Sequence, residues 1–467
     1  MSPKAMRWFA VLGAAALVLA MPRPDGITVE SWQLLAIFTA TIVGSIAQPI
    51  APGAVVFLGI CAIALFNVMT PKSALAGFAD PIVWLVLCAF FISRGVIKTG
   101  FGRRLAFLFI RAIGQSSLGL VYALISTDAL LAAFVPSNGA RAGGVIFPVA
   151  KSLAEAYDSR PGETAQKLGA FLLIAIYQCD VIASMMWLTG QASNVLIAKF
   201  ALDTAHVEMT YGKWILGSIV PGVILLILVP LVLYKLYPPG IKHTPDAARI
   251  AGEELDKMGA MSRDERTMLF VFVLVAGLWM TTALHHINYA VVALLGISVL
   301  FLSNVLTWDD ITGERPAWDV FIWYGGLVRM AEALGETGIT VKFAEAAASM
   351  TIGWTWGAAL AVLSLIYFYA HYGFASITAH SSAMFIPFLV VVLGAGAPPL
   401  LAVLTLAYFS NLSACLTHYG TTPAPIYFGA GYITQKDWWL YGFVVSVLSI
   451  LVFATIGLGW WKLLGWW

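Results

Sequence analysis

The sequence predicts an all-α polytopic membrane protein with about eleven transmembrane helices and two re-entrant hairpins, arranged as two inverted-topology repeats. Three observations support this fold class. Hydrophobic residues make up 60% of the 467 residues and charged residues 11%, whereas soluble domains are roughly 45–50% apolar. Apolar segments long enough to cross a bilayer follow one another along the chain. A polar motif that interrupts an apolar region occurs twice.

The membrane spans are predicted from segment length. A bilayer core about 30 Å thick requires about 20 helical residues. The first span, within residues 1–29, could instead be a signal peptide, since Lys4 and Arg7 precede an apolar run that ends in small residues. The predicted spans lie near 8–21, 30–48, 53–69, 81–97, 166–200, 213–234, 267–285, 288–305, 319–334, 398–428 and 438–459.

The two predicted hairpins carry the repeated motif. SNGARAGGVIFP occupies 137–148 and SITAHSSAMFIP occupies 376–387, within the segments 116–150 and 354–395. The limb after each motif, at about ten residues, would reach only about 15 Å as a helix, so each segment should enter and leave on one side. Non-helical backbone at membrane depth is tolerated only beside protein or a watery cavity, so the tips should line a cavity.

The repeat extends well beyond the motif. Residues from about 30 to 235 resemble residues from about 267 to the end at 467, and the polar segment 236–266 joins them. Five spans and one hairpin per copy is an odd count, so the second copy should enter the membrane upside down. Each copy also contains a broken helix, at 166–200 and 398–428. This combination is typical of secondary transporters.

Lysine and arginine in the short loops predict the orientation. With the amino terminus inside, the basic clusters around Arg103, Arg160 and the linker fall on the cytoplasmic side, and few basic residues remain outside. We therefore expect a multi-pass protein with a cytoplasmic amino terminus.

The four interruptions predict the binding site. They lie at 137–139, 190–194, 376–378 and 420–425, where Ser and Asn can cap helices and Gly or Pro releases the backbone. Four helix starts facing one cavity would supply roughly +2 of charge, which suits a dianion. The predicted substrate-binding residues are Ser137, Asn138, Gly139, Gly190, Ser193, Asn194, Ser376, Thr378, Gly420, Thr421, Thr422 and Pro423.

Arg141 and His380 occupy matching positions in the two motifs. A charge at the bilayer centre needs an anionic partner or water, because an unpaired Arg costs about 2.5–3.5 kcal/mol there. We expect both residues to compensate the substrate charge. The alternative is a structural pair between Arg141 and Asp128 or Asp180.

Several other chemistries are disfavoured. A net charge of +2 over this length gives no support for nucleic-acid binding. Four cysteines without CxxC spacing predict neither disulfides nor a zinc site. His371, His380 and His418 match no metal-binding spacing, and His285 with His286 is more typical of an interfacial pair. We expect no metal, no cofactor and no enzymatic activity.

Beside the two hairpin motifs, the sequences LTHYGTTPAPIYFGAGYI, FADPIVWLVLCAFF and KTGFGRR resemble the divalent anion:sodium symporter family. The chain is most similar to its bacterial citrate/succinate and tartrate/succinate antiporter branch and to the plastid 2-oxoglutarate/malate translocators. The resemblance covers nearly the whole chain. It implies a homodimer in the bacterial inner membrane, in which a transport domain slides past a scaffold domain as an elevator.

The resemblance also implies how substrate binds. In that family, paired Ser-Asn-Thr tips bind the substrate carboxylates. Ser137, Asn138, Ser376 and Thr378 match those tips, whereas Gly139 replaces Thr and Ile377 replaces Asn. Loss of the hydroxyl at Gly139 leaves room that could change which acid fits.

The expected function is secondary active transport of di- and tricarboxylates by sodium-independent obligate exchange. Examples are succinate against citrate, tartrate, malate or 2-oxoglutarate. Fixed charge on Arg141 and chargeable His380 could replace the sodium ions of coupled relatives, and an empty carrier with uncompensated charge should cross poorly. The alternative is a sodium- or proton-coupled symporter of the same fold, with Asp128, Asp180 and His418 as coupling groups.

Overall fold

The computed structural model describes residues 2–339, 342 and 353–467. The regular secondary structure of this part of the chain is helical, apart from one isolated β-bridge between Ser116 and His243, and the expected all-α fold class is confirmed. The part of the second repeat at 340–341 and 343–352 lies outside the described residues.

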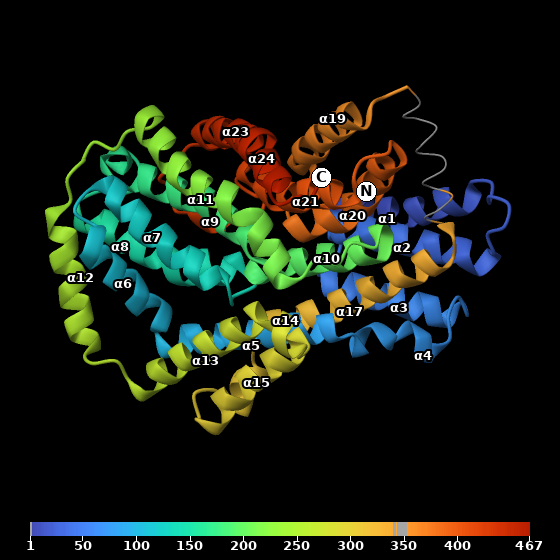
Figure 1. Ribbon diagram of the computed structural model, residues 1–467, viewed down its shortest axis with the longest axis horizontal. Coiled ribbons are helices and arrows are strands. Elements are labelled where there is room, and N and C mark those ends of the chain that lie inside the picture. The colour runs from blue at the N-terminus through green and yellow to red at the C-terminus, as the bar shows by residue number, and fades with distance from the viewer. Residues whose placement is uncertain (1, 340–341, 343–352) are drawn as a thin grey trace.

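The helices follow one another with short connections (Figure 1). Up to the linker they are α1 (Pro3–Ala20), α2 (Val29–Ala47), α3 (Pro52–Leu65), α4 (Pro71–Ala74), η1 (Ala76–Ala79), α5 (Pro81–Thr99), α6 (Phe101–Ile113), α7 (Ser117–Ala132), η2 (Gly139–Ile146), α8 (Phe147–Ala156), η3 (Ala165–Lys167), α9 (Gly169–Met186), η4 (Leu188–Gly190), α10 (Ala192–Ala205) and α11 (Tyr211–Leu236).

The linker contains α12 (Pro245–Met258). The remaining helices are α13 (Arg263–Met280), α14 (Thr282–His285), α15 (Tyr289–Leu302), α16 (Trp308–Thr312), α17 (Arg315–Glu336), α19 (Trp356–Tyr369), η5 (Ala370–Gly373), α20 (Ile377–Gly394), α21 (Pro399–Leu412), η6 (Ser413–Cys415), α22 (Ala424–Gly429), α23 (Gln435–Val452), η7 (Phe453–Gly457) and α24 (Leu458–Leu463).

Local sequence explains where these helices begin and end. Asp80 accepts a hydrogen bond from the Ile82 amide and precedes a proline at the first position of α5. At the other end of α5, Gly100 has a φ of 73°, a conformation that glycine adopts without a steric penalty. Ser262 and Glu265 form a reciprocal capping box at the start of α13.

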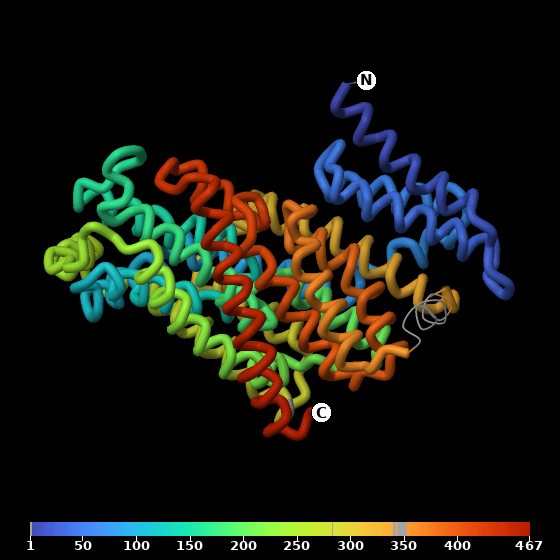
Figure 2. The backbone as a smooth tube through the Cα atoms, turned by 90° about the horizontal axis from the view of Figure 1, so that it is seen from above, coloured from blue at the N-terminus to red at the C-terminus, as the bar shows by residue number. Residues whose placement is uncertain are grey.

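Seven described helices are long and apolar enough to span a membrane: α1, α2, α5, α9, α11, α20 and the continuous α23–α24. Shorter apolar helices, including α3, α7, α15 and α21, accompany them. Each of the eleven predicted spans coincides with at least one helix, but the count of eleven remains a prediction. Figure 2 shows α1 reaching beyond the other helices at the amino-terminal end of the molecule.

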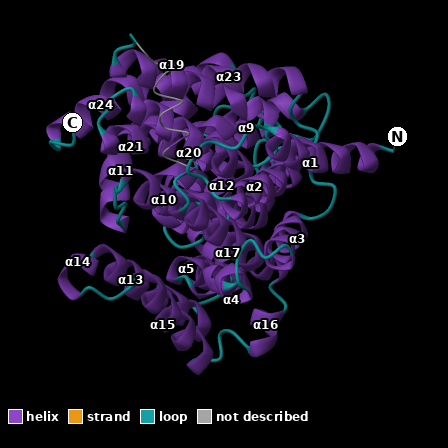
Figure 3. Cartoon of the chain, turned by 90° about the vertical axis from the view of Figure 1, so that its right-hand side faces the viewer, coloured by secondary structure: helices purple, strands orange, loops and turns teal. Residues whose placement is uncertain are grey.

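The helices fall into two groups, which can be followed in Figures 1 and 3. The tip group contains α7 to α11 and α19 to α24, and the support group contains α3, α5 and α13 to α17. The groups meet where α10 packs against α5 and α17, and α2 packs against α3, α17 and α20. This contact region positions the candidate site.

The two hairpins differ in how their motifs fold. In the first, α7 ends at Ala132 and the chain turns back into the π-helical η2 and then α8. In the second, α19 and η5 lead to Ser376, which caps α20. The interpretation of the motif as a non-helical break is wrong for both hairpins, since the continuous η2–α8 runs from Gly139 to Ala156 and α20 is 18 residues long and includes the motif. Each motif is helical because its first residue caps the helix: Ala140 N donates to Ser137 Oγ at 3.2 Å, and Ala379 N donates to Ser376 Oγ at 3.4 Å.

The polar linker packs against the tip group through α12 and α6. Glu254 of α12 accepts hydrogen bonds from Lys257 at 2.7 Å and from Arg103 of α6 at 2.6 Å. The hydrogen bond from Lys257 and the positive charges of both neighbours lower the pKa of Glu254. This ion pair connects the linker helix α12 to α6, the helix that precedes the first hairpin.

Candidate functional site

A cavity of about 260 Å³ lies between the two helix groups, and we call it the tip cavity. On one side it is lined by residues of α2, α3, α5 and α17 and of the turn after α2. On the other side it is lined by both hairpin tips and by the interruptions before α10 and α22. The tip-group lining comprises Pro136, Ser137, Asn138, Gln191, Ala192, Ser376, Thr378, Ala379, Ser382, Thr421 and Thr422.

Helix starts surround this cavity. The continuous η2–α8 begins after Asn138, α10 begins after Gln191, and α20 begins after Ser376. The first N–H groups of a helix lack intrahelical partners and carry roughly half a positive charge per helix. Three such starts, together with hydroxyl and carboxamide groups, offer hydrogen-bond donors to an anion. None of these donors carries a formal charge.

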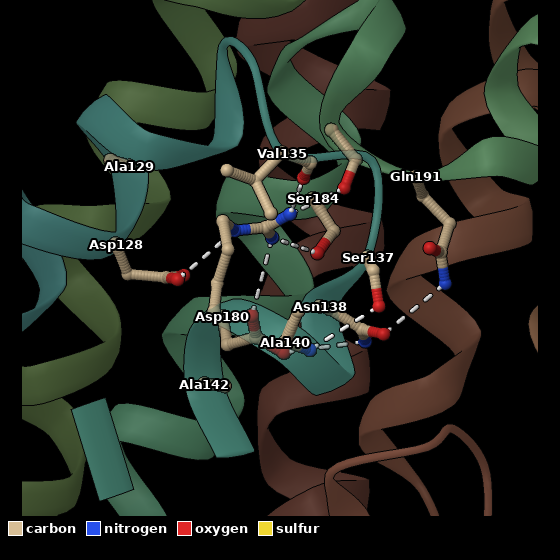
Figure 4. A network of polar contacts seen from close by, with 12 residues as sticks. Asp128, Ala129, Val135, Ser137, Asn138, Ala140, Ala142, Asp180, Ser184 and Gln191 are labelled. Atoms are coloured by element: carbon tan, nitrogen blue, oxygen red, sulfur yellow. Dashed lines mark hydrogen bonds and ion pairs between the residues drawn. The ribbon is translucent and has the colours of Figure 1, made fainter. Parts of the chain in front are cut away.

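One hydrogen-bond network joins three of the interruptions, and Figure 4 shows its part around Asn138 and Gln191. The Asn138 side chain donates through Nδ2 to Thr421 Oγ1 at 2.9 Å and to Asp180 Oδ2 at 3.4 Å. Its Oδ1 accepts from Gln191 Nε2 at 3.3 Å. Because Asn138 is only 1% exposed, its amide is held between the cavity lining and the interior of the tip group.

Behind Asn138 lies a buried ionic group that we call the acid–arginine cluster, consisting of Asp128, Arg141 and Asp180 (Figure 4). Arg141 donates to Asp128 Oδ1 at 3.1 Å and to Asp180 Oδ1 at 3.3 Å. Its remaining donors reach the carbonyls of Val135 and Gly190 and the hydroxyl of Ser184 at 2.6–2.7 Å. Arg141 therefore fixes the first tip and the broken helix at Gly190 to α7 and α9.

Behind the second tip lies a group of neutral hydrogen bonds. His380 donates through Nε2 to the Tyr367 carbonyl at 2.9 Å, and His371 donates through Nε2 to the Gly420 carbonyl at 2.9 Å. The two imidazole rings are 5.0 Å apart, and both residues are fully buried. Since a carbonyl can only accept, the Nε2 atom of each ring carries the hydrogen.

The predicted substrate-binding residues divide into two sets. Six line the tip cavity: Ser137, Asn138, Ser376, Thr378, Thr421 and Thr422. Six lie outside its lining: Gly139, Gly190, Ser193, Asn194, Gly420 and Pro423.

The residues outside the lining support the interruptions. The Asn194 side chain donates to the carbonyls of Ser184 and Trp187 and accepts from Asn411 at 2.6 Å. At Gly139, an added Cβ would lie 2.7 Å from Thr422 Cγ2. These side chains and this glycine hold the cavity walls in place from behind.

Neither of the residues expected to compensate charge lines the cavity. Arg141 is paired with both Asp128 and Asp180. This arrangement corresponds to the alternative of a structural ion pair, with both candidate acids as partners. His380 has no carboxylate among its described hydrogen-bond or ion-pair partners. Compensation of substrate charge by these two residues stays a prediction.

Several lining residues lie outside the predicted set. Gln191 stands inside the predicted interruption 190–194, so its carboxamide was the available signal. Ser45, Gln48, Asp319 and Trp323 come from the support side, where no repeated motif marks them. A carboxylate within an apolar span was the only local signal for Asp319.

A second cavity of about 1220 Å³ adjoins the first and shares Ile42 and Ser382 with it. Its lining is mainly apolar, and its acidic residues are Asp203, Glu332 and Glu336. These acids form ion pairs with Lys199 and Arg329, and the lining contains no carboxamide among its described residues, whereas the smaller cavity presents hydroxyls, carboxamides and helix starts. Polar chemistry therefore makes the tip cavity the candidate binding site.

The remaining sequence predictions concern metals and single side chains. No group of three or more His, Cys, Asp or Glu side chains with metal-binding geometry occurs within residues 2–339, 342 and 353–467. His418 accepts a hydrogen bond from Trp439 at 3.1 Å, and His285 contacts the Leu278 carbonyl. Cys88, Cys179 and Cys415 are buried free thiols, and Cys61 is exposed.

Comparison with known proteins gives concordant matches. The chain is 47% identical to the putative malate transporter YflS of Bacillus subtilis over 96% of this chain and 94% of that protein. It is 44% identical to the chloroplastic dicarboxylate transporter 1 of Arabidopsis thaliana, over 96% and 81% of the two chains. It is 35% identical to the citrate/succinate antiporter of Escherichia coli, over 98% and 96%.

Solved structures support the fold. The YdaH transporter of Alcanivorax borkumensis, whose crystal structure was described as having an unusual topology, aligns with a TM-score of 0.59 at 15% identity. The alignment covers 98% of this chain and 99% of that one. The family described as the sodium:sulfate symporter transmembrane region matches residues 2–467. The resemblance inferred from the motifs is thereby confirmed: the chain is a membrane-spanning transporter that belongs to the sodium:sulfate symporter family.

Proposed function

We propose that this protein is a secondary transporter of di- and tricarboxylates that binds its substrate in the tip cavity. The observation that carries this proposal is the convergence of three helix starts with the polar side chains of both hairpin tips on one cavity. Such a site recognises carboxylates through N–H and O–H donors. The relatives named as malate, dicarboxylate and citrate/succinate transporters agree with this substrate class.

The proposed mode is obligate, sodium-independent exchange. Among the described lining residues there is no Lys, Arg or His side chain, and the one acidic side chain is Asp319. An empty cavity leaves the helix-start N–H groups without an anion while the tips cross a region of low dielectric, which disfavours return of the empty carrier. Exchange of one carboxylate for another avoids that state. The antiport function of the Escherichia coli relative supports this mode.

The movement that we propose is a displacement of the tip group along the support group. The cavity lies between these groups, so its two sides separate when one group moves relative to the other. We further propose a homodimer in the bacterial inner membrane with the amino terminus in the cytoplasm, as the distribution of basic loops predicts. Sodium- or proton-coupled symport is the second candidate, because two acidic side chains lie buried behind Asn138.

The test is uptake of labelled succinate by proteoliposomes whose lumens contain succinate, citrate, tartrate, malate, 2-oxoglutarate or buffer alone, each with and without sodium. We expect uptake only into loaded vesicles, at rates that do not depend on sodium. Uptake into vesicles containing buffer alone that requires sodium or a proton gradient would identify a symporter instead. Absence of uptake under every condition would contradict carboxylate transport.

A further inference from the structure

The acid–arginine cluster contains more negative than positive charge. Asp128 and Asp180 are 1% and 0% exposed, and Arg141 is 1% exposed. With all three groups ionised, the cluster has one uncompensated negative charge in a protein interior away from water. Burial of an unpaired charge is strongly unfavourable, so a further positive charge is expected in the same place.

An unpartnered oxygen shows what could provide that charge. Asp128 Oδ2 is buried and has no hydrogen-bond donor, although the other oxygen accepts from Arg141. Arg141 brings the two carboxyl groups together, because its Nε donates to Asp128 Oδ1 at 3.1 Å and its Nη2, on the same edge of the guanidinium, donates to Asp180 Oδ1 at 3.3 Å. Two carboxylates cannot bond to each other when both are ionised, but a single proton between them provides the missing donor and makes the cluster neutral.

The surroundings of the two acids contain no other charged side chain among the described contacts. The titratable side chains near the two acids are Arg141 of η2, Tyr177 and Cys179 of α9, and Tyr427 of α22. Tyr177 donates its hydroxyl hydrogen to the Ala414 carbonyl and Tyr427 to the Ala142 carbonyl, so neither is free to protonate the acids. The shared proton must therefore come from solvent.

Asn138 connects this pair of acids to the tip cavity. Its Nδ2 atom donates at 2.9 Å to Thr421 and at a weaker 3.4 Å to Asp180. A substrate carboxylate in the cavity would attract the same amide donors and would add negative charge nearby. Both effects favour the protonated form of Asp180. Loss of the Asn138 hydrogen bond removes a donor to the ionised carboxylate, and the negative charge of the substrate repels that carboxylate.

We propose that Asp128 and Asp180 form a proton-binding site whose occupancy is coupled to occupancy of the tip cavity, so that binding of a dianion is accompanied by proton uptake. This inference rests on the proposed function and adds the proton as a second ligand. The proton would travel with the substrate in the tip group. By reciprocity, the substrate should bind more tightly at lower pH.

The experiment measures proton uptake directly. Purified protein in weakly buffered detergent solution is mixed with tartrate, which is fully ionised from pH 6 to pH 8, and a pH indicator records protons taken up per substrate bound. We expect uptake of more than zero and less than one proton per site, because part of the protein already holds the shared proton before the substrate binds. Calorimetry at several pH values should show that the Kd rises with pH, by at most about tenfold per unit for one linked proton.

Single variants locate the proton. Asp180→Asn and Asp128→Asn each leave one carboxylate paired with Arg141 and should bind tartrate without proton uptake and with a Kd that does not depend on pH. Asp203→Asn, an acid at the second cavity, is the matched control and should keep the wild-type behaviour. If either cluster variant fails to fold, the number of protons taken up by the wild-type protein still tests whether substrate binding is coupled to proton uptake.

The outcomes separate the two proposals. Tartrate or succinate binding without proton uptake would overturn the proton site and leave carboxylate transport intact. Full proton uptake by both cluster variants would also overturn it, since the proton would then bind elsewhere. Failure to bind or exchange any of the tested carboxylates would overturn the proposed function, and the proton site with it.

Discussion

The two hairpins carry related motifs, yet the interiors behind them are built from opposite chemistry. Behind the first tip, Arg141 lies between two carboxylates in an ionic cluster. Behind the second, His380 and His371 donate to backbone carbonyls and are surrounded by the aromatic rings of Tyr367 and Phe374. A matching position in the repeat therefore holds a paired cation on one side and a hydrogen-bonded ring on the other.

The difference teaches that one motif position can support a tip in two ways. An ionic cluster holds the chain strongly but responds to any change in its charge. A histidine bonded to a carbonyl, with no acid in contact within the described part of the chain, keeps its position whether or not a substrate charge is present. We expect the first hairpin to sense protons and the second to act as a fixed wall.

The largest effect is expected from Arg141→Gln. Removing the cation leaves two buried carboxylates without their positive partner and three further oxygen acceptors, two carbonyls and one hydroxyl, without this donor. Breaking a buried ion pair in this way typically costs about 3–5 kcal/mol. The thermal unfolding midpoint of the purified protein should fall sharply.

Two further variants control for this result. Arg249→Gln removes an exposed cation on the linker helix and should leave the midpoint nearly unchanged. Arg141→Gln combined with Asp128→Asn and Asp180→Asn removes all three charges and should recover part of the loss. Equal stability of wild type and Arg141→Gln would show that the cluster does not hold the first tip.

The next largest effect is expected at Gly139, which faces Thr422 across the cavity wall, whereas the second tip has Thr378 at the matching position. In Gly139→Ala, the new Cβ would lie 2.7 Å from Thr422 Cγ2. Overpacking costs typically 1–3 kcal/mol, so we expect apparent substrate affinity in the exchange assay to weaken by about tenfold or more.

The chain offers matched controls for this variant. Gly144→Ala lies in the same helical segment and meets no atom within 4 Å, so it should behave as wild type. Adding Thr422→Ser to Gly139→Ala removes the opposing methyl group and keeps the hydroxyl, and should restore affinity. If the double variant stays impaired, the glycine is needed for another reason.

The site was predictable where the signal was local. The repeated motif marked four predicted tip residues that line the cavity, and the break in the second broken helix marked Thr421 and Thr422. Both acids that pair with Arg141 could be named from the sequence. The sequence did not predict that both would contact Arg141 at the same time. The support-side residues Gln48, Asp319 and Trp323 could not be found, because only tertiary packing brings α2 and α17 to the tips. The length of α20 was missed because the motif was taken as a break and not as a helix start.

A smaller effect is expected from His380→Gln. The Gln side chain can still donate to the Tyr367 carbonyl, so the loss of stability should not exceed the roughly 0.5–1.5 kcal/mol typical of one hydrogen bond. The ratio of exchange rates at pH 6 and pH 8 should equal that of the wild type, because proton sensing is assigned to the first hairpin. A flattened pH profile in His380→Gln, with a normal profile in Asp180→Asn, would reverse the comparison.

The smallest effect is expected from an ion pair outside the membrane-spanning segments, which shows how much burial adds to the first cluster. Asp310 of α16 accepts a hydrogen bond from Lys98. Burial opposes ionisation of Asp310, but the hydrogen bonds from Lys98 and Thr307 outweigh it and lower its pKa to about 2. The lowered pKa means that this stabilisation is complete above the ordinary carboxyl value near 4 and is lost as pH falls toward 2. Asp310→Asn should therefore reduce the free energy of unfolding by about 0.5–1 kcal/mol at pH 6, measured from the shift in the unfolding midpoint, and by much less near pH 2.

Asp309→Asn on the same short helix serves as the control, and added salt should narrow the difference between wild type and Asp310→Asn at pH 6. A loss as large as that of Arg141→Gln would mean that burial adds little to the acid–arginine cluster.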